Sequence, residues 1–277
     1  MFDTIVSIRE VAERRADPRL ILVDCRHGLA DFTAGRRAYE QAHLPGAFFA
    51  DTETDLAGEK TGKNGRHPLP DRDAFVAFLR RNGVNDDTQV VAYDAGADMF
   101  AARFWFLMRW IGHEAVAVLD GGYAAWTAAA YPVKTDLPQR QPGTISAREP
   151  LDGTLDAATL ATSDVVLLDA RAGERYRGEV EPIDPVAGHI PGARNRWFKE
   201  NFDERGFWKS PERLRAELAE HGSPEQVVHY CGSGVSAAVN LLAYKIAGHS
   251  DTKLYPGGWS EWCAGSSRAA SGTPQQP

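Results

Sequence analysis

The sequence has 277 residues, which is long enough for two domains of common size. A formal net charge of -7 without a basic stripe excludes typical nucleic-acid binders, and no apolar run approaches the roughly 18 residues of a membrane span. We therefore expect a cytoplasmic protein with neither a nucleic-acid nor a membrane partner. Cys25, Cys231 and Cys263 are an odd number, and neither CxxC nor HExxH spacing occurs. We expect no disulfide framework, no metal and no cofactor.

The two halves of the sequence repeat the same blocks in the same order. Each half has an apolar run ending in Asp-x-Arg, then a His-x-Pro-Gly-Ala segment, a second apolar run ending in Tyr, and a Gly-Gly turn beside aromatic residues. The matched blocks are 20–26 with 165–171, 42–47 with 188–193, 90–94 with 227–231, and 119–126 with 254–262. Four ordered matches indicate a tandem duplication.

Short apolar runs alternate with amphipathic stretches in each half, which predicts an α/β fold with a parallel sheet flanked by helices. In the first half the runs 90–93 and 116–119 are expected strands, and 72–82 and 99–111 are expected helices. The proline-rich stretch 135–150 is typical of a linker. We expect a non-catalytic domain over 1–134, this linker, and a catalytic domain over 151–277. The small, polar tail 264–277 is expected to fray.

The segment 227–247 predicts a strand, a tight loop and a helix, with Cys231 at the strand end. Gly232 and Gly234 allow the backbone to turn its amides inward, and a helix N-terminus would stabilise a thiolate there. A buried structural cysteine is the alternative. The first half has Asp94 at the matching position, so the fold does not need a thiol for packing. This comparison favours a nucleophile.

These blocks, the loop Cys231-Gly232-Ser233-Gly234-Val235 and the end motif around Trp259 resemble the two-domain rhodanese family over about residues 5–263. The resemblance implies tandem rhodanese-like domains and a sulfurtransferase, in which Cys231 takes a sulfane sulfur from a small anionic donor and passes it to cyanide, a thiol or thioredoxin. The neutral loop resembles the branch that uses 3-mercaptopyruvate. A cysteine phosphatase would need an arginine six residues after the cysteine, where this chain has Ala237.

The resemblance also implies which residues bind the donor. Arg175 matches the family's anion-binding position, whereas Arg171 serves equally well in a structural ion pair with Asp169. Asp184 stands where the 3-mercaptopyruvate branch usually has a second arginine. The loop residues expected at the substrate are Gly232, Gly234, Val235 and Ser236, with Ser236 alternatively a helix N-cap.

Ser233 is expected, from the same resemblance, to form a relay with His67 as base and Glu53, or else Asp51, as the group that orients it. A solvated histidine is the alternative for His67. His43 and His189 recur in both halves and are expected to hold the fold, and the aromatic residues after the Gly-Gly turns are expected to pack the domains.

Two alternatives remain at the level of function. The enzyme could prefer thiosulfate as its donor, or the chain could be a non-catalytic rhodanese-like module that binds partners or carries sulfur. The intact cysteine loop favours the enzyme. Cys25 and Cys263 are expected to be inert packing residues.

Overall fold

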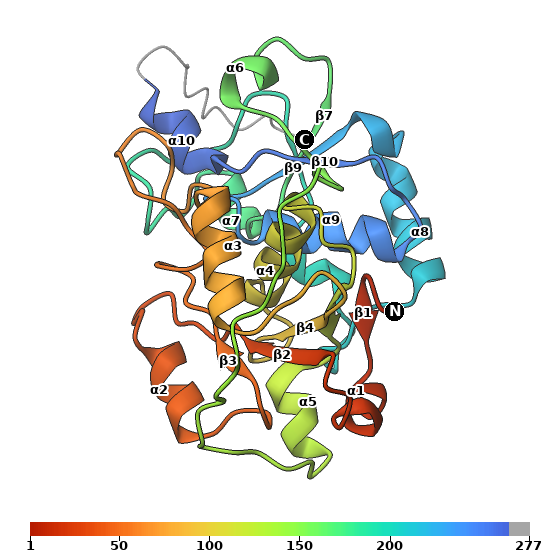
Figure 1. The fold of residues 1–277 in the computed structure, drawn as a ribbon. Helices are drawn as coiled ribbons and strands as arrows, with labels where there is room; N and C mark the ends of the chain where they lie inside the picture. Colours follow the sequence, from red (N-terminus) through yellow and green to blue (C-terminus); the bar gives the residue numbers. More distant parts are fainter. Residues whose placement is uncertain (266–277) are drawn as a thin grey trace. The chain divides into compact units, whose positions relative to one another are not determined.

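The computed structural model describes residues 1–265, and the expectation for the tail concerns residues that lie mostly outside this range. The chain forms two compact units (Figure 1). Unit 1 comprises residues 1–58, 70–151 and 202–208, and unit 2 comprises 59–69, 152–201 and the chain from 209 onward. The short segment 59–69, from the first half of the sequence, thus belongs to the second unit.

Unit 1 is built on a five-stranded parallel sheet in the order β1-β5-β4-β2-β3. Its central strands are near-continuous apolar runs, as expected for a sheet covered on both faces. The register pairs Val23 with Ala92 and Val91 with Ala117. The strands are β1 (Ile5–Val6), β2 (Leu20–Asp24), β3 (Phe48–Phe49), β4 (Gln89–Tyr93) and β5 (Val116–Leu119).

Helices cover both faces of this sheet, with α3 and α4 on one side and α1 and α5 on the other (Figure 1). Ser7 and Asp71 cap α1 and α3 by accepting backbone N–H groups. The helix α4 is buried along almost its whole length. The helices are α1 (Ile8–Arg14), α2 (Ala34–Gln41), α3 (Arg72–Arg81), α4 (Phe100–Trp110) and α5 (Gly122–Ala128).

Unit 2 repeats this sheet as β6-β10-β9-β7-β8, again with every pairing parallel. Leu168 pairs with His229 between its two longest strands. The strands are β6 (Gly153–Thr154), β7 (Val166–Asp169), β8 (Arg194–Asn195), β9 (Val227–Tyr230) and β10 (Lys253–Leu254).

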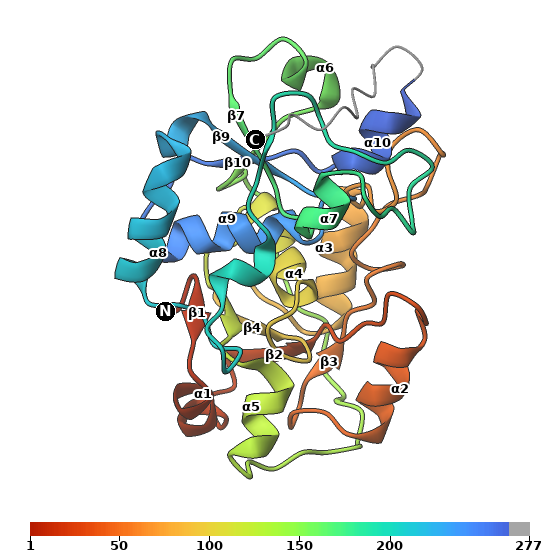
Figure 2. The same cartoon turned by 180° about the vertical axis from the view of Figure 1, so that it is seen from behind.

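The helices of unit 2 also lie on two sides of its sheet, with α8 and α9 on one and α6 and α10 on the other (Figure 2). A core of buried residues that includes Leu167, Tyr230 and Trp259 packs under α6 and α10. The helices are α6 (Ala157–Leu160), α7 (Gly173–Tyr176), α8 (Pro211–Leu218), α9 (Ala237–Ile246) and α10 (Gly258–Ala264), with 3-10 turns η1 (Phe198–Asn201), η2 (Ala219–His221) and η3 (Pro224–Gln226).

The same histidine–tyrosine contact occurs within each unit, at matching positions of the repeat. His43 stacks on Tyr39 with the ring centroids 4.1 Å apart and bonds to its carbonyl, and His189 stacks on Tyr176 at 4.0 Å and does the same. Both histidines therefore hold the fold. Of the aromatic residues after the Gly-Gly turns, Trp126, Trp259 and Trp262 are buried as expected, whereas Tyr123 is half-buried.

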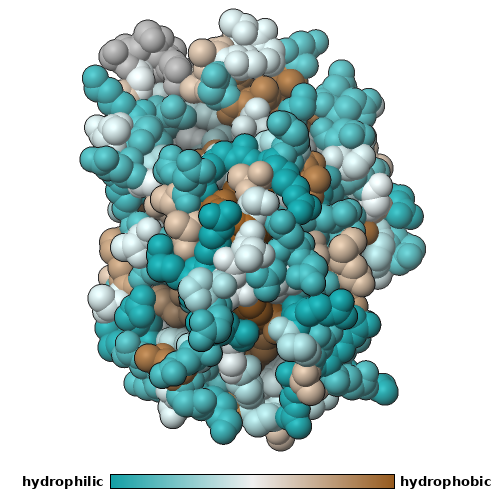
Figure 3. All heavy atoms as spheres, viewed as in Figure 1, coloured by the Kyte–Doolittle hydropathy of each residue, from teal (hydrophilic) through white to brown (hydrophobic). Residues whose placement is uncertain are grey.

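Figure 3 shows one face of the molecule, on which hydrophilic side chains predominate and apolar ones are scattered. Within residues 1–265, none of the helices combines the length and the apolar character that a membrane crossing requires.

Candidate active site

Cys231 follows directly after β9, at the carboxyl end of the strand, where parallel α/β sheets bind their ligands. Its side chain is buried, and its Sγ accepts the backbone N–H of Gly234 at 3.1 Å. Its carbonyl accepts the N–H of Trp259 at 2.7 Å, which ties the loop to the start of α10. The sulfur is therefore held in one position, with an N–H group directed at it.

Two glycines of the loop serve different purposes. Gly234 has φ +76°, in the left-handed region that glycine adopts without the steric cost of a side chain. Gly232 does not have a positive φ. Instead, a Cβ on Gly232 would lie 2.7 Å from Nη2 of Arg66, so the missing side chain makes room for a guanidinium. The backbone bends at Gly232 as expected, and the glycine also permits the close approach of a cation.

Arg171 is fully engaged in the protein. Its Nε and Nη2 donate to the two oxygens of Asp169 at 3.0 and 2.6 Å, and Nη2 also donates to a backbone carbonyl. Unit 1 has the same buried pair between Arg26 and Asp24, at 3.0 and 2.6 Å. Because the pair recurs in the unit that has Asp94 in place of the loop cysteine, its primary role is to stabilise the strand end.

Arg175 lies at the end of α7 beside two carboxylates. Its Nη2 donates to Glu181 Oε1 at 2.7 Å and lies 3.4 Å from Asp184 Oδ2. Glu181 also accepts the N–H of Asp184 at 3.0 Å, which fixes this turn. The side chain of Arg175 is 18% exposed, whereas those of Glu181 and Asp184 are almost fully buried. Arg175 therefore keeps a part of its surface available to a ligand.

Arg66 is a site residue that the sequence analysis missed. Its Nη1 forms an ion pair with Asp184 Oδ1, and its Nη2 lies against Gly232. Burial lowers the pKa of Arg66 from its ordinary value, the thiol of Cys231 acts in the opposite direction, and the charge of Arg175 lowers the pKa further. The one signal in the sequence is that Arg66 immediately precedes His67.

His67 and Ser233 are in contact, with His67 Nδ1 2.7 Å from Ser233 Oγ. A hydrogen bond holds the neighbouring residue in place, because the N–H of Arg66 donates to Ser260 Oγ at 3.1 Å. Ser233 itself is buried. A hydroxyl bonded to an imidazole can pass a proton to or from a reacting group.

Glu53 and Asp51 belong to unit 1. The Glu53 carboxylate lies 3.7 Å from Nε2 of His27, and its backbone N–H donates to Asp51 Oδ1 at 2.8 Å. Their role as orienting groups for His67 remains a prediction.

The last two residues of the loop lead into α9. Ser236 is the N-cap residue of this helix, but its hydroxyl makes no capping hydrogen bond. The capping alternative is therefore not realised through the side chain. Val235 and Ser236 are both buried, and their role toward a substrate remains a prediction.

Comparison with known proteins now gives the family. A model described as a rhodanese-like domain matches residues 7–129 and again 155–265. The chain belongs to the rhodanese family. This confirms the predicted tandem rhodanese-like domains, each with a helix-flanked parallel sheet.

Relatives within the rhodanese family are similar along almost the full length. A probable 3-mercaptopyruvate sulfurtransferase of Pseudomonas aeruginosa is 43% identical over 267 residues, covering 93% of this chain and 94% of its own. A putative thiosulfate sulfurtransferase of Mycobacterium tuberculosis is 41% identical over 261 residues, covering 91% and 90%. The predicted sulfurtransferase activity is thereby confirmed.

Solved rhodanese structures agree in fold. The 3-mercaptopyruvate sulfurtransferase of Leishmania major has a TM-score of 0.84 at 28% identity, covering 94% of this chain and 74% of its own. The corresponding protein of Escherichia coli has a TM-score of 0.81 at 29% identity, covering 93% and 99%.

The other two thiols of this rhodanese have pKa values above that of a free cysteine. Burial raises the pKa of Cys25 well above its usual value, and the nearby carboxylate of Asp24 adds to the rise. Burial also raises the pKa of Cys263. A raised pKa leaves less thiolate at neutral pH. This is consistent with the packing role expected of both residues.

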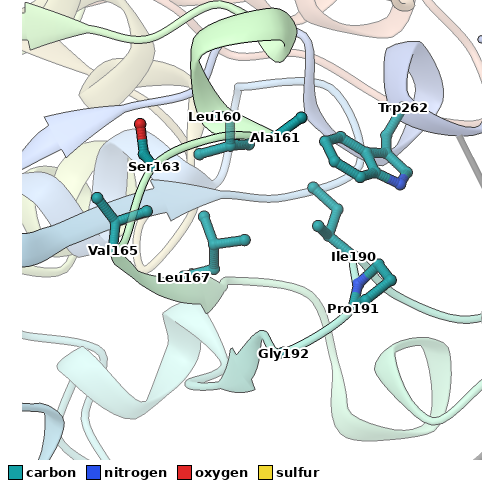
Figure 4. A pocket seen from close by; sticks show the side chains of 9 residues that line it. All are labelled: Leu160, Ala161, Ser163, Val165, Leu167, Ile190, Pro191, Gly192 and Trp262. Carbon is teal, nitrogen blue, oxygen red and sulfur yellow. The ribbon is translucent and has the colours of Figure 1, made fainter.

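An apolar pocket of about 390 Å³ lies elsewhere in unit 2 (Figure 4). Ile190 and Trp262 lie near each other on one side of it, with Val165 and Ser163 on the other, and Ser163 carries the one hydroxyl among the described lining side chains. The lining that residues 1–265 provide contains neither a thiol nor a charged side chain, so it is not suited to bind an anionic sulfur donor. The lining residues are Leu160, Ala161, Ser163, Val165, Leu167, Ile190, Pro191, Gly192 and Trp262.

Proposed function

We propose that Cys231 is the nucleophile that takes a sulfur atom from 3-mercaptopyruvate and passes it to an acceptor thiol, to thioredoxin or to cyanide. The observation that carries this proposal is the Cys231 sulfur, held at a strand end 3.1 Å from the N–H of Gly234 and within the field of Arg66. A backbone N–H directed at the sulfur and a guanidinium close to it stabilise a thiolate and the persulfide anion that follows it.

The first step forms an S–S bond and breaks a C–S bond. The Cys231 thiolate attacks the sulfur of the donor, and the electron pair of the C–S bond moves to carbon. The carbon fragment leaves as the enolate of pyruvate, takes up a proton and becomes pyruvate, while Cys231 holds the persulfide. In the second step an acceptor attacks the outer sulfur, and the Cys231 thiolate is released.

Arg175 binds the donor carboxylate in this scheme, because its side chain retains an exposed portion next to the loop. The surface against which the sulfur of the donor lies is formed by Gly232, Val235 and Ser236. Arg171 acts indirectly, since its guanidinium is engaged by Asp169 and it helps to hold Glu181 in place.

The Ser233 and His67 pair supplies the proton that the enolate needs. The 2.7 Å contact between Oγ and Nδ1 allows the hydroxyl to donate to the carbonyl oxygen of the donor while Nδ1 donates a proton to that hydroxyl. His67 thus acts as an acid in this step, rather than as the base expected from the sequence. Glu53, or else Asp51, would orient His67. Thiosulfate gives sulfite rather than an enolate, so this pair is specific to the 3-mercaptopyruvate reaction.

We assign the chemistry to the domain over 151–277, joined by the linker 135–150 to a non-catalytic domain over 1–134. The support is that Asp94 replaces the cysteine in the first domain. The segment 59–69 modifies this division, because it brings His67 to Ser233.

Thiosulfate is the second candidate donor, and the similarity to a putative thiosulfate sulfurtransferase favours it. A neutral Gly-Ser-Gly loop attracts a dianion less strongly than a basic loop would. We therefore expect the larger kcat/KM with 3-mercaptopyruvate. A clear preference for thiosulfate would overturn this choice of donor.

Release of thiocyanate from cyanide and each donor tests the proposal. The native protein should turn over with 3-mercaptopyruvate, and Cys231→Ser should not. Cys263→Ser is the matched control and should retain the native rate. Equal, slow release by the native protein and Cys231→Ser with both donors would show that the chain is not a sulfurtransferase that works through Cys231.

A further inference from the structure

The segment 59–69 places a cation beside the reactive sulfur. A Cβ on Gly65, which has φ +83°, would lie 2.7 Å from the carbonyl of Gly257, so the backbones touch there. The next residue, Arg66, donates its N–H to Ser260 Oγ at 3.1 Å. These contacts fix the backbone from which the Arg66 side chain extends toward Gly232.

The guanidinium of Arg66 has one engaged end and one end directed at the loop. Its Nη1 pairs with the buried carboxylate of Asp184, while its Nη2 lies 2.7 Å from the position of a Cβ on Gly232. The side chain of Arg66 is 28% exposed, against 2% for Asp184. Asp184 therefore anchors the guanidinium from the protein side, and the opposite side is open to a ligand.

Asp184 holds two guanidiniums with its two oxygens. Oδ1 pairs with Arg66, and Oδ2 lies 3.4 Å from Nη2 of Arg175. Nη1 of Arg175 lies 3.8 Å from the same hypothetical Cβ on Gly232 that Arg66 approaches. Two cations spaced by one carboxylate thus converge on the residue after Cys231.

The charges of this cluster are balanced. Arg66, Arg171 and Arg175 are matched by Asp169, Glu181 and Asp184, and the ion pairs among them are direct. A donor with one negative charge can bind to the exposed parts of two guanidiniums. A dianion gains less electrostatic binding free energy here than it would in a site with a net positive charge. It also loses more hydration, because it carries more charge.

We propose that Arg66 is a second donor-binding residue, and that Asp184 positions it and limits the positive charge that the donor meets. This inference rests on the proposed function, because it takes an anionic sulfur donor for granted. It assigns to residue 66 a role in binding and to residue 184 a role in donor selectivity.

The first test is Arg66→Gln, with Arg177→Gln as the matched control. Arg177 is an exposed arginine of the same unit that pairs with Glu179. Loss of a charge-assisted hydrogen bond should raise KM for 3-mercaptopyruvate and the inhibition constant of pyruvate about tenfold in Arg66→Gln. Arg66→Lys should recover part of this loss, and Arg177→Gln should match the native protein.

A second variant covers the case in which Arg66→Gln folds poorly. Gly232→Ala keeps every charge but displaces the Arg66 guanidinium, so it should raise the same two constants. Persulfide on the native protein, measured by intact mass after 3-mercaptopyruvate, tests the proposed function separately. If the native protein forms persulfide but Arg66→Gln and Gly232→Ala keep native KM and inhibition constants, the role of Arg66 is wrong. If the native protein forms no persulfide, the proposed function itself fails.

Asp184→Asn tests the selectivity. Removing one negative charge should favour the dianion, so the ratio of kcat/KM for thiosulfate to that for 3-mercaptopyruvate should rise about fivefold. A residue that only supports the fold would lower both values by the same factor. An unchanged or smaller ratio would therefore overturn the role given to Asp184.

Discussion

Gly234→Ala perturbs the cysteine loop without touching a charge. The substitution leaves Cys231 in the sequence, but it places a Cβ 2.3 Å from the carbonyl oxygen of Pro256. The two atoms must separate by about 0.7 Å to reach the 3.0 Å that real Cβ contacts require. Because the obstacle is backbone rather than a flexible side chain, the loop has to move.

A residue of unit 1 allows two contributions to the loss of stability to be considered separately, namely the left-handed conformation and the overpacking. Ala97 matches Gly234 in the repeat and has φ +49°, so an alanine can adopt the left-handed conformation in this loop. That conformation costs an alanine about 1 kcal/mol. Overpacking against the Pro256 backbone adds about 1–3 kcal/mol. We expect Gly234→Ala to lower the free energy of unfolding by about 2–4 kcal/mol in total.

Urea unfolding followed by tryptophan fluorescence measures this loss, and persulfide formation measures the effect on Cys231. Gly234→Ala should unfold at a lower urea concentration and form persulfide slowly, because the N–H that bonds to the sulfur is displaced. Gly232→Ala is the control, since its Cβ meets only the movable end of Arg66, and it should keep most of the stability. A native unfolding midpoint for Gly234→Ala would refute this reasoning about the loop.

Three further predictions concern stability and the proton relay. Burial lowers the pKa of His229 to about 3, so the free energy of unfolding should fall as the pH drops from about 6.5 toward 3, by about 2 kcal/mol at pH 5. The urea midpoint should decrease less over this pH range in His229→Met than in the native protein. Ser233→Ala and His67→Gln should lower kcat with 3-mercaptopyruvate about 100-fold but spare thiosulfate, and an equal loss with both donors would contradict the relay. Lys245→Met removes the cation 2.7 Å from buried Asp152 and should cost about 3–5 kcal/mol in urea unfolding, whereas a native midpoint would contradict that estimate.

The fold was predictable because its causes are local and occur twice. Apolar runs that end in Asp-x-Arg specify β2 and β7, and the buried pairs Asp24–Arg26 and Asp169–Arg171 show why the pattern recurs. The helices α3 and α4 begin and end within a residue or so of the periodic stretches that predict them.

The cation beside Cys231 was not predictable in the same way. Arg66 and Asp184 are 118 residues apart, and neither lies in a repeated block. Only the fold shows that the segment 59–69 belongs to unit 2. The fold also shows that a side chain at position 232 would collide with the Arg66 guanidinium. The sequence also suggests a missing arginine at position 184, whereas the structure places a carboxylate there that holds two other arginines.

Locating the transferred sulfur after a single turnover would show directly whether Cys231 is the nucleophile. The protein would be treated with 3-mercaptopyruvate without an acceptor, digested, and each cysteine peptide weighed. We expect one added sulfur atom on the peptide that contains Cys231 and native masses for those that contain Cys25 and Cys263. Sulfur on another cysteine, or on none, would contradict this expectation.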